Sequence, residues 1–181
     1  MENIIIAEIG ENHYGRWDVC RGMVEEVAQG GAHYAKFQTY TAEQFGEDHV
    51  WYGEFKKVEM PEAVHFEMQA LCRERGVGFL CSTFTQRSTA FLVDRMGCGE
   101  LKLASSRVTD LALLDYVNSR SAQERFIHAF VEVAVHPCIT KLSEIKYRDH
   151  SRPSVVVARV CVPAIDSGGA TPDSAFQSAL C

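Results

Sequence analysis

The sequence predicts an α/β fold with a parallel sheet, and three observations support this prediction. Short apolar segments alternate with helical patterns four times within residues 1–120. Glycines end the helical patterns, at Gly30, Gly76 and Gly97. The composition, 46% hydrophobic and 23% charged over 181 residues, is that of one ordinary globular domain with a proper core.

The first two units have distinct signals. A strand is predicted at 4–10 (IIIAEIG), and a helix at 17–29, where apolar residues recur at helical spacing. A second strand is predicted at 33–40. A long polar and aromatic connection follows it and ends near Pro61, which suits the first position of a helix.

The remaining units follow the same rules. Thr85 and Asp110 are residues of the type that caps helix N-termini. The predicted elements are a helix after Pro61 that ends at Gly76, a strand at 77–83, a helix at 85–97, a strand at 100–106 and a helix from Asp110.

Two parallel architectures compete for this pattern, a doubly wound open sheet and a (β/α)8 barrel. No GxGxxG follows any predicted strand, which disfavours a dinucleotide-binding sheet. Barrel enzymes build their sites from residues at the ends of several strands. Here the predicted strands carry such residues, namely Glu8, Lys36, Gln38, Ser82, Lys102 and Ser105.

Two lysines lie inside apolar strand segments. Lysine is rarely buried unless it is paired, so Lys36 and Lys102 each need an anion, either a protein carboxylate or a ligand phosphate. Two cations that converge on one barrel mouth would bind a dianionic ligand. Ser82 and Ser105 could donate hydrogen bonds to phosphate oxygens, although each alone is also ordinary turn chemistry. Glu8 alone is equally well explained as a salt-bridged residue at the rim.

Aromatic and histidine residues near these positions have simpler interpretations. His13 is expected to be a hydrogen-bonding loop residue rather than a metal ligand. Trp51, Tyr52 and Phe55 could form a lid over a pocket or a small satellite core under a long loop. We favour the satellite core.

Charge and composition exclude several classes of protein. The net charge of −6 argues against a nucleic-acid-binding surface or a polybasic membrane anchor. No apolar run approaches the roughly 18 residues of a membrane span, and no signal peptide is recognised, so a cytoplasmic protein is expected. The seven cysteines are scattered and never spaced CxxC, so we expect small buried hydrophobic residues rather than disulfides or a zinc site.

Four motifs occur in order: AEIGENHYG, AKFQTYTAE, GVGFLCSTF and LKLASSRVTDLALLDYV. They resemble the sialic acid synthase family, which comprises N-acetylneuraminate synthases and their legionaminic, pseudaminic and spore-coat relatives. That family reads EIG-x-NH-x-G, KFQT, F-(L)-STPF and K-(I)-(AG)-SG at its first four strands. Each motif alone is weak, but four in register are fairly specific, and they cover residues 3–118.

The resemblance implies a (β/α)8 barrel that condenses phosphoenolpyruvate with an N-acyl mannosamine-type sugar, giving a nonulosonic acid and phosphate. It also implies a divalent metal, Mn or Mg, that polarises the sugar aldehyde, and a homodimer. No nucleic-acid or membrane partner is implied.

The resemblance also implies roles for individual residues. Glu8 would be the acidic residue beside the sugar. Phosphoenolpyruvate would be bound by Lys36, Gln38, Lys102 and Ser105, and by Ser82, which stands where the family usually has threonine.

Two residues depart from the family motifs. Thr83 replaces the proline of STPF, and Ser106 replaces the glycine that follows the serine of the fourth motif. Close approach of the backbone can require glycine at such a position, so the loop geometry is expected to differ.

The character of the chain changes near residue 120. Residues 1–120 hold 18 acidic and 12 basic residues, a difference of −6, whereas 121–181 hold six of each and four of the five prolines. The family continues with GKPVILSTGM, but this chain reads SAQERFIHAFVEVAVHPC. His136 in AVHPC and His150 in RDHS could echo the family's metal histidines, yet the spacing is shorter, and the metal ligands stay unassigned.

The sequence thus predicts a partial TIM-type (β/α) barrel of about four strand–helix units plus an atypical C-terminal segment, since eight units need roughly 200–250 residues. Residues 1–120 would form the N-terminal half of a synthase-like barrel. Residues 121–181 would be a divergent, partly disordered tail that arose by truncation, a reading-frame change or unusual splicing.

Three functional hypotheses remain open. The first is a synthase-like transferase that forms a carbon–carbon bond. The second is an inactive fragment that retains at most phosphoenolpyruvate binding. The third is another phosphate-binding barrel lyase or aldolase in which Lys36 or Lys102 forms a Schiff base.

Overall fold

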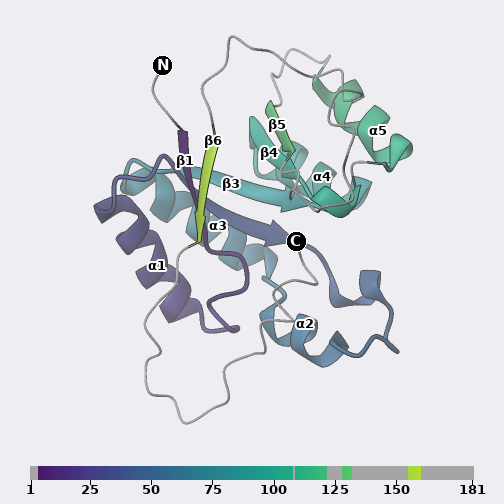
Figure 1. Ribbon diagram of the computed structural model, residues 1–181, viewed down its shortest axis with the longest axis horizontal. Coiled ribbons are helices and arrows are strands. Elements are labelled where there is room, and N and C mark those ends of the chain that lie inside the picture. Colours follow the sequence, from purple (N-terminus) through teal and green to yellow (C-terminus); the bar gives the residue numbers. More distant parts are fainter. Residues whose placement is uncertain (1–3, 108, 122–127, 132–154, 160–181) are drawn as a thin grey trace.

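A computed structural model describes residues 4–107, 109–121, 128–131 and 155–159 (Figure 1). Its strands are β1 (Ile4–Glu8), β2 (Tyr34–Thr39), β3 (Gly78–Thr83), β4 (Glu100–Leu103), β5 (His128–Val131) and β6 (Val155–Arg159). Its α-helices are α1 (Trp17–Gln29), α2 (Tyr52–Val58), α3 (Glu62–Glu74), α4 (Gln86–Ala90) and α5 (Leu111–Ser121). Short 3-10 turns form η1 (Ala42–Phe45) and η3 (Ser105–Arg107), and a π-helical turn forms η2 (Phe91–Arg95).

All six strands belong to one parallel sheet with the order β5-β4-β3-β2-β1-β6. Strands β1 to β5 follow one another in space as they do in sequence, as consecutive strands of a barrel do, and β6 pairs with the other edge of β1. Helices connect the first four strands, as a barrel requires. The predicted partial (β/α) barrel of four strand–helix units is therefore confirmed.

Helices cover one face of this sheet. Figure 1 shows α1 and α3 next to each other on that face, and Phe37 and Cys81 reach them from paired positions of β2 and β3. Because side chains alternate along a strand, the residues between these positions point to the opposite face. The resulting main core is built from the sheet and the two helices, with Ala7, Ala35, Phe37, Cys81, Cys20, Met23, Val24, Met68 and Cys72 among its buried residues.

Local signals explain most helix boundaries. The predicted helix at 17–29 is α1 without change. Thr85 forms a complete capping box with Ser88, in which each side chain accepts a hydrogen bond from the other residue's backbone N–H, at 3.1 and 3.0 Å. The Asp110 carboxylate accepts from the backbone N–H of Leu113 at 3.0 Å, as expected of a cap.

Several predicted element bounds were wrong, and the predicted strand 4–10, for example, ends at Glu8. The predicted strand 100–106 stops at Leu103, because the chain turns into η3. The connection after β2 is not a simple loop, since it contains η1 and α2. Pro61 precedes α3 as its N-cap rather than occupying its first position.

The segment after β2 packs on its own small core. Tyr40, Phe55 and Phe84 are buried together here, and Phe45 lies against them. We call the following residues the aromatic cluster: Tyr40, Ala42, Phe45, Trp51, Tyr52, Phe55, Val58, Phe84 and Ala104. The satellite core expected for Trp51, Tyr52 and Phe55 is thereby confirmed. Figure 1 shows α2 beyond the arrowhead of β2, so this cluster lies at the carboxyl end of the sheet.

The four cysteines of the described residues are buried thiols, as expected from their scattered spacing. Burial raises the pKa of Cys20 and of Cys72 to about 12. Both thiols therefore stay protonated at neutral pH and pack as small apolar groups. The other three cysteines of the sequence lie outside the described residues.

Two glycines provide a stability test. Gly15 has a φ of +75°, and a Cβ there would lie 2.4 Å from the backbone oxygen of Lys57. Gly22 lies in α1 with nothing within 4 Å of such a Cβ. We expect Gly15→Ala to lower the free energy of unfolding by at least about 2 kcal/mol. Gly22→Ala should raise it by about 0.5–1 kcal/mol, because alanine is the better helix former.

Urea unfolding of the wild type and both variants measures these differences. Equal changes in the two variants would contradict this account of Gly15.

Candidate active site

Strand register places five of the predicted site residues on one face of the sheet. Glu8 of β1 is opposite Lys36 of β2. Lys36 and Gln38 are two residues apart on β2, so their side chains lie on the same face. Gln38 is opposite Ser82 of β3, and Ser82 is opposite Lys102 of β4. All five therefore point away from the face that α1 and α3 cover. We call Gln38, Ser82 and Lys102 the polar row.

Glu8 and Lys36 form an ion pair in which the Lys36 ammonium donates to Glu8 Oε2. The Lys36 side chain is 3% exposed and the Glu8 side chain 16%. The anion that a buried Lys36 requires is therefore supplied by the protein. An ammonium has three protons, so Lys36 can bridge Glu8 and a further acceptor.

The loop after β1 brings its backbone close to this pair. Gly10 has a φ of +49°, and a Cβ there would lie 3.1 Å from Glu8 Oε1 and 3.6 Å from Gln38 Nε2. The Gln38 amide donates to Glu11 Oε2 at 3.2 Å. The backbone N–H groups of Ile9 and Gly10 both donate to the carbonyl of Lys36, at 2.9 and 3.1 Å. The glycine thus lets the chain turn tightly over the two site residues.

Several buried oxygens at this end of the sheet lack a hydrogen-bond partner among the described residues. Glu8 Oε1, Gln38 Oε1 and Ser82 Oγ are three of them, and each belongs to a residue on the site face. A buried polar atom without a partner costs free energy, and native proteins seldom tolerate it outside functional sites. These oxygens are therefore acceptors that a polar ligand on this face could use.

Lys102 adds a second buried ammonium, with 7% exposure, next to Ser82. Ser105 begins η3, one residue beyond Ala104. The side chain of Ser105 lies outside what the structure describes, so its predicted role stays a prediction.

His13 is a buried loop residue, as the sequence predicted. Its Nδ1 accepts the backbone N–H of Gly15 at 3.0 Å, and its ring lies 4.8 Å from that of Trp17. Burial lowers the pKa of His13 from 6.5 to about 4. The imidazole is therefore neutral at pH 7 and holds the loop after β1.

A buried hydrogen-bond chain behind β2 was missed by the sequence analysis. His65 of α3 bonds to the carbonyl of Pro61 through Nδ1 at 3.1 Å, and to Thr39 Oγ1 through Nε2 at 2.9 Å. Thr39 Oγ1 also lies 2.7 Å from Cys81 Sγ. Since a carbonyl only accepts, Nδ1 carries the proton in the neutral ring and Thr39 donates to Nε2. This chain fixes the end of β2 next to Gln38. The only available signal was a histidine on the apolar face of a helix.

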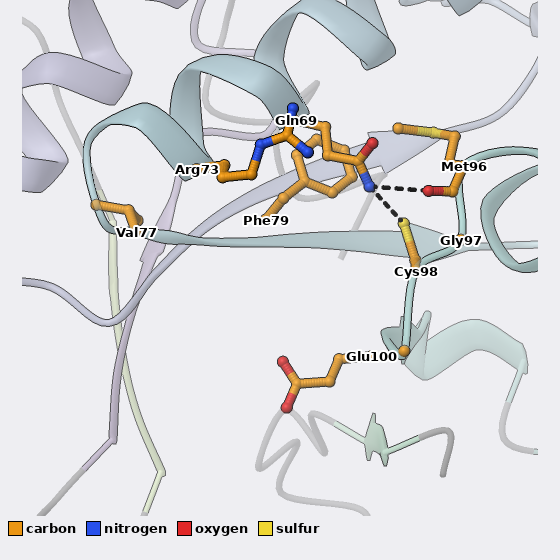
Figure 2. Close-up of a pocket in the computed structure, with 9 residues that line it drawn as sticks. Gln69, Arg73, Val77, Phe79, Met96, Gly97, Cys98 and Glu100 are labelled. Carbon is orange, nitrogen blue, oxygen red and sulfur yellow. Dashed lines mark hydrogen bonds between the residues drawn. The ribbon is translucent and has the colours of Figure 1, made fainter. Parts of the chain in front are cut away.

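A pocket of about 470 Å³ lies at the opposite end of the sheet, beside the starts of β3 and β4 (Figure 2). None of the predicted site residues lines it. Figure 2 shows Gln69 donating to the carbonyl of Met96 at 3.1 Å and to Cys98 Sγ at 3.5 Å. Barrel enzymes place their sites at the carboxyl ends of the strands, so this pocket is not the candidate site.

The residues that the structure describes do not fit a divalent metal. No group of three or more histidines, cysteines, aspartates or glutamates among them could hold one. His136 and His150 lie outside the described residues.

None of the described helices is long and apolar enough to cross a membrane.

A parallel half-barrel with a buried polar face at the carboxyl ends of its strands has the architecture of a (β/α) barrel, and barrel enzymes carry their sites at that end. A model of the NeuB family matches residues 23–127, which is more than half of the chain. The chain belongs to the NeuB family, as the motifs predicted.

Similar proteins are named as synthases of acidic sugars or as a spore coat polysaccharide biosynthesis protein. An N-acetylneuraminate-9-phosphate synthase of Drosophila melanogaster is 33% identical over 61% of this chain and 33% of its own length. An N,N'-diacetyllegionaminic acid synthase of Legionella pneumophila is 27% identical over 66% of this chain and 38% of its own length. The spore coat polysaccharide biosynthesis protein SpsE of Bacillus subtilis is 30% identical over 72% of this chain and 38% of its own length. The chain thus spans about a third of the length of these relatives.

Solved structures agree on the fold. An N-acetylneuraminic acid synthetase from Leptospira borgpetersenii, crystallised with citrate, superposes with a TM-score of 0.62 at 21% identity. The match covers 75% of this chain and 56% of that one. SpsE of Bacillus subtilis superposes with a TM-score of 0.57 at 25% identity and covers 75% of this chain and 45% of its own.

The Glu8–Lys36 pair leads to a prediction about stability. Lys36→Met removes one partner and leaves a buried carboxylate, so we expect a loss of about 3 kcal/mol or more in the free energy of unfolding. Replacing both partners, Glu8→Leu with Lys36→Met, should recover most of that loss. Urea unfolding of the single and double variants tests this. Additive losses would show that the two side chains do not interact.

The pKa of His13 predicts a pH dependence. Between pH 6.5 and about 4 the unfolded chain binds a proton at His13 that the folded chain does not. Stability is therefore lost as the pH falls through this window, by about 3 kcal/mol in total. His13→Asn should be less stable at pH 7 but lose less between pH 6.5 and 4. Urea unfolding across that range checks it, and parallel pH profiles would refute it.

Proposed function

We propose that this chain carries the phosphoenolpyruvate-binding half of a nonulosonic acid synthase site. The observation that carries the proposal is the site face, where two buried lysines and several unpartnered oxygens converge at the carboxyl ends of four parallel strands. Relatives named as synthases of N-acetylneuraminate 9-phosphate and diacetyllegionaminic acid support the same reaction class.

The reaction joins phosphoenolpyruvate to an N-acyl mannosamine-type aldehyde. C3 of phosphoenolpyruvate attacks the aldehyde carbon and forms the new carbon–carbon bond, and the aldehyde oxygen takes up a proton. Water adds at C2, and the C2–oxygen bond to phosphate breaks. The products are a nonulosonic acid and inorganic phosphate, so all atoms of the two substrates and the water are accounted for.

The described residues support this chemistry by charge and position. Lys102 and Ser82 lie side by side and suit the phosphate or carboxylate of phosphoenolpyruvate. Lys36 can bridge Glu8 and the same ligand, and Gln38 lies between the two lysines on this face. Glu8 would face the aldehyde substrate. No step is assigned to a metal, since the described residues offer no ligand set for one.

Calorimetric titration with phosphoenolpyruvate tests the proposal. We expect saturable binding by the wild type and binding that is about tenfold weaker or worse in Lys102→Ala, because a charged hydrogen bond is lost. Lys57→Ala is the matched control, since the Lys57 side chain is 67% exposed and pairs with Glu54. Its affinity should equal that of the wild type.

A wild-type chain that unfolds cooperatively yet binds no phosphoenolpyruvate would defeat the proposal and leave an inactive fragment. If the wild type does bind phosphoenolpyruvate, release of phosphate in the presence of N-acetylmannosamine would establish turnover.

A further inference from the structure

One tyrosine next to the polar row has no part in the proposed reaction. Tyr40 follows β2 directly and continues the alternation of Lys36 and Gln38. Phe84 continues β3 beyond Ser82 in the same way, and the rings of Tyr40 and Phe84 are 5.8 Å apart. Tyr40 therefore lies immediately beyond the polar row.

Neighbouring rings fix the position of Tyr40. Phe45, Phe55 and Phe84 contact its ring edge to face, at centroid distances of 5.3, 6.1 and 5.8 Å and interplanar angles of 77°, 79° and 86°. Such contacts hold an aromatic ring in one orientation. The hydroxyl position is thus set by the aromatic cluster and does not depend on a hydrogen bond.

The hydroxyl itself is buried and unpartnered. Tyr40 is 6% exposed, and its hydroxyl has no hydrogen-bond partner among the described residues. Buried tyrosine hydroxyls usually find one. Burial and the Glu11 and Glu59 carboxylates raise the pKa of Tyr40, so the hydroxyl keeps its proton at neutral pH and can donate.

The groups around this hydroxyl indicate which part of a ligand it contacts. The Glu11 carboxylate is one of the charges that raise the pKa of Tyr40, and it accepts a hydrogen bond from the Gln38 amide. Glu8 Oε1 and Gln38 Oε1 add two unpartnered acceptors at the β1–β2 side of the site. The two charged groups that raise the pKa of Tyr40 are both carboxylates, Glu11 and Glu59, and Lys36, four residues back along the chain, is paired with Glu8. The hydroxyl of Tyr40 therefore suits a neutral hydroxyl group of a ligand better than an anion.

We propose that the Tyr40 hydroxyl is a specificity-determining group that donates a hydrogen bond to a hydroxyl oxygen of the acceptor sugar. This rests on the proposed function, in which Lys36, Gln38, Ser82 and Lys102 contact phosphoenolpyruvate. The aromatic cluster holds Tyr40 in place.

Tyr40→Phe tests the proposal because it keeps the ring and removes only the hydroxyl. The matched control is Tyr52→Phe, whose ring packs on the same cluster while its hydroxyl donates to Glu43 at 3.3 Å near the surface. Wild type and both variants are titrated calorimetrically with N-acetylmannosamine and, separately, with phosphoenolpyruvate. Thermal unfolding of each is recorded.

We expect Tyr40→Phe to bind N-acetylmannosamine about 3- to 10-fold more weakly, the effect of one lost neutral hydrogen bond. Its affinity for phosphoenolpyruvate should be unchanged, and its unfolding midpoint unchanged or higher, since an unpartnered buried hydroxyl has been removed. Tyr52→Phe should bind both ligands like the wild type.

Other outcomes separate the two proposals. If all three proteins bind both ligands equally, the role of Tyr40 is overturned and the proposed function stands. Equal weakening for both ligands, or a lowered unfolding midpoint in Tyr40→Phe, assigns the hydroxyl a structural role and also overturns it. A wild type that binds neither ligand overturns the proposed function and the role of Tyr40 together.

Discussion

The alternation of side chains along parallel strands is the constraint on which the rest of this structure depends. One set of alternate residues must be apolar, because α1 and α3 pack on it. The other set does not pack on these helices, so it can be polar near the carboxyl ends, where it includes Glu8, Lys36 and Ser82. A shift of one residue in register would bury these charges against the helices and expose Phe37. The site and the core are therefore specified by the same pattern.

Charge balance within the site follows from its depth. An isolated buried ammonium is costly, and Glu8 offsets that cost for Lys36 on the neighbouring strand. Such a pair contributes little net stability compared with apolar residues of the same size. The pair holds two polar groups at fixed positions on the site face, where the proposed ligand would contact both.

The sequence predicted the fold well and the site in part. Apolar segments bounded by glycines identified the four strand–helix units, and five of the polar residues predicted at the strand ends share one face of the sheet. The Glu8–Lys36 contact could not be predicted, because it depends on the relative register of β1 and β2, which no local signal determines. The helical turns of η1 and α2 were missed because they are short and rich in aromatic residues, which resemble a loop. His65 reads as an ordinary apolar-face residue until its contact with Thr39 is known.

The position of β6 has a consequence for how the chain folds. Strands β1 to β5 pair with sequence neighbours, so this part of the sheet can grow as the polypeptide leaves the ribosome. In contrast, Ile4 of β1 pairs with Val155 of β6, almost the whole chain length away. Closing so long a loop is slow, and the outer edge of β1 stays open to other strands until it happens. Until β6 is made, the outer edge of β1 is thus an edge at which aggregation can compete with folding.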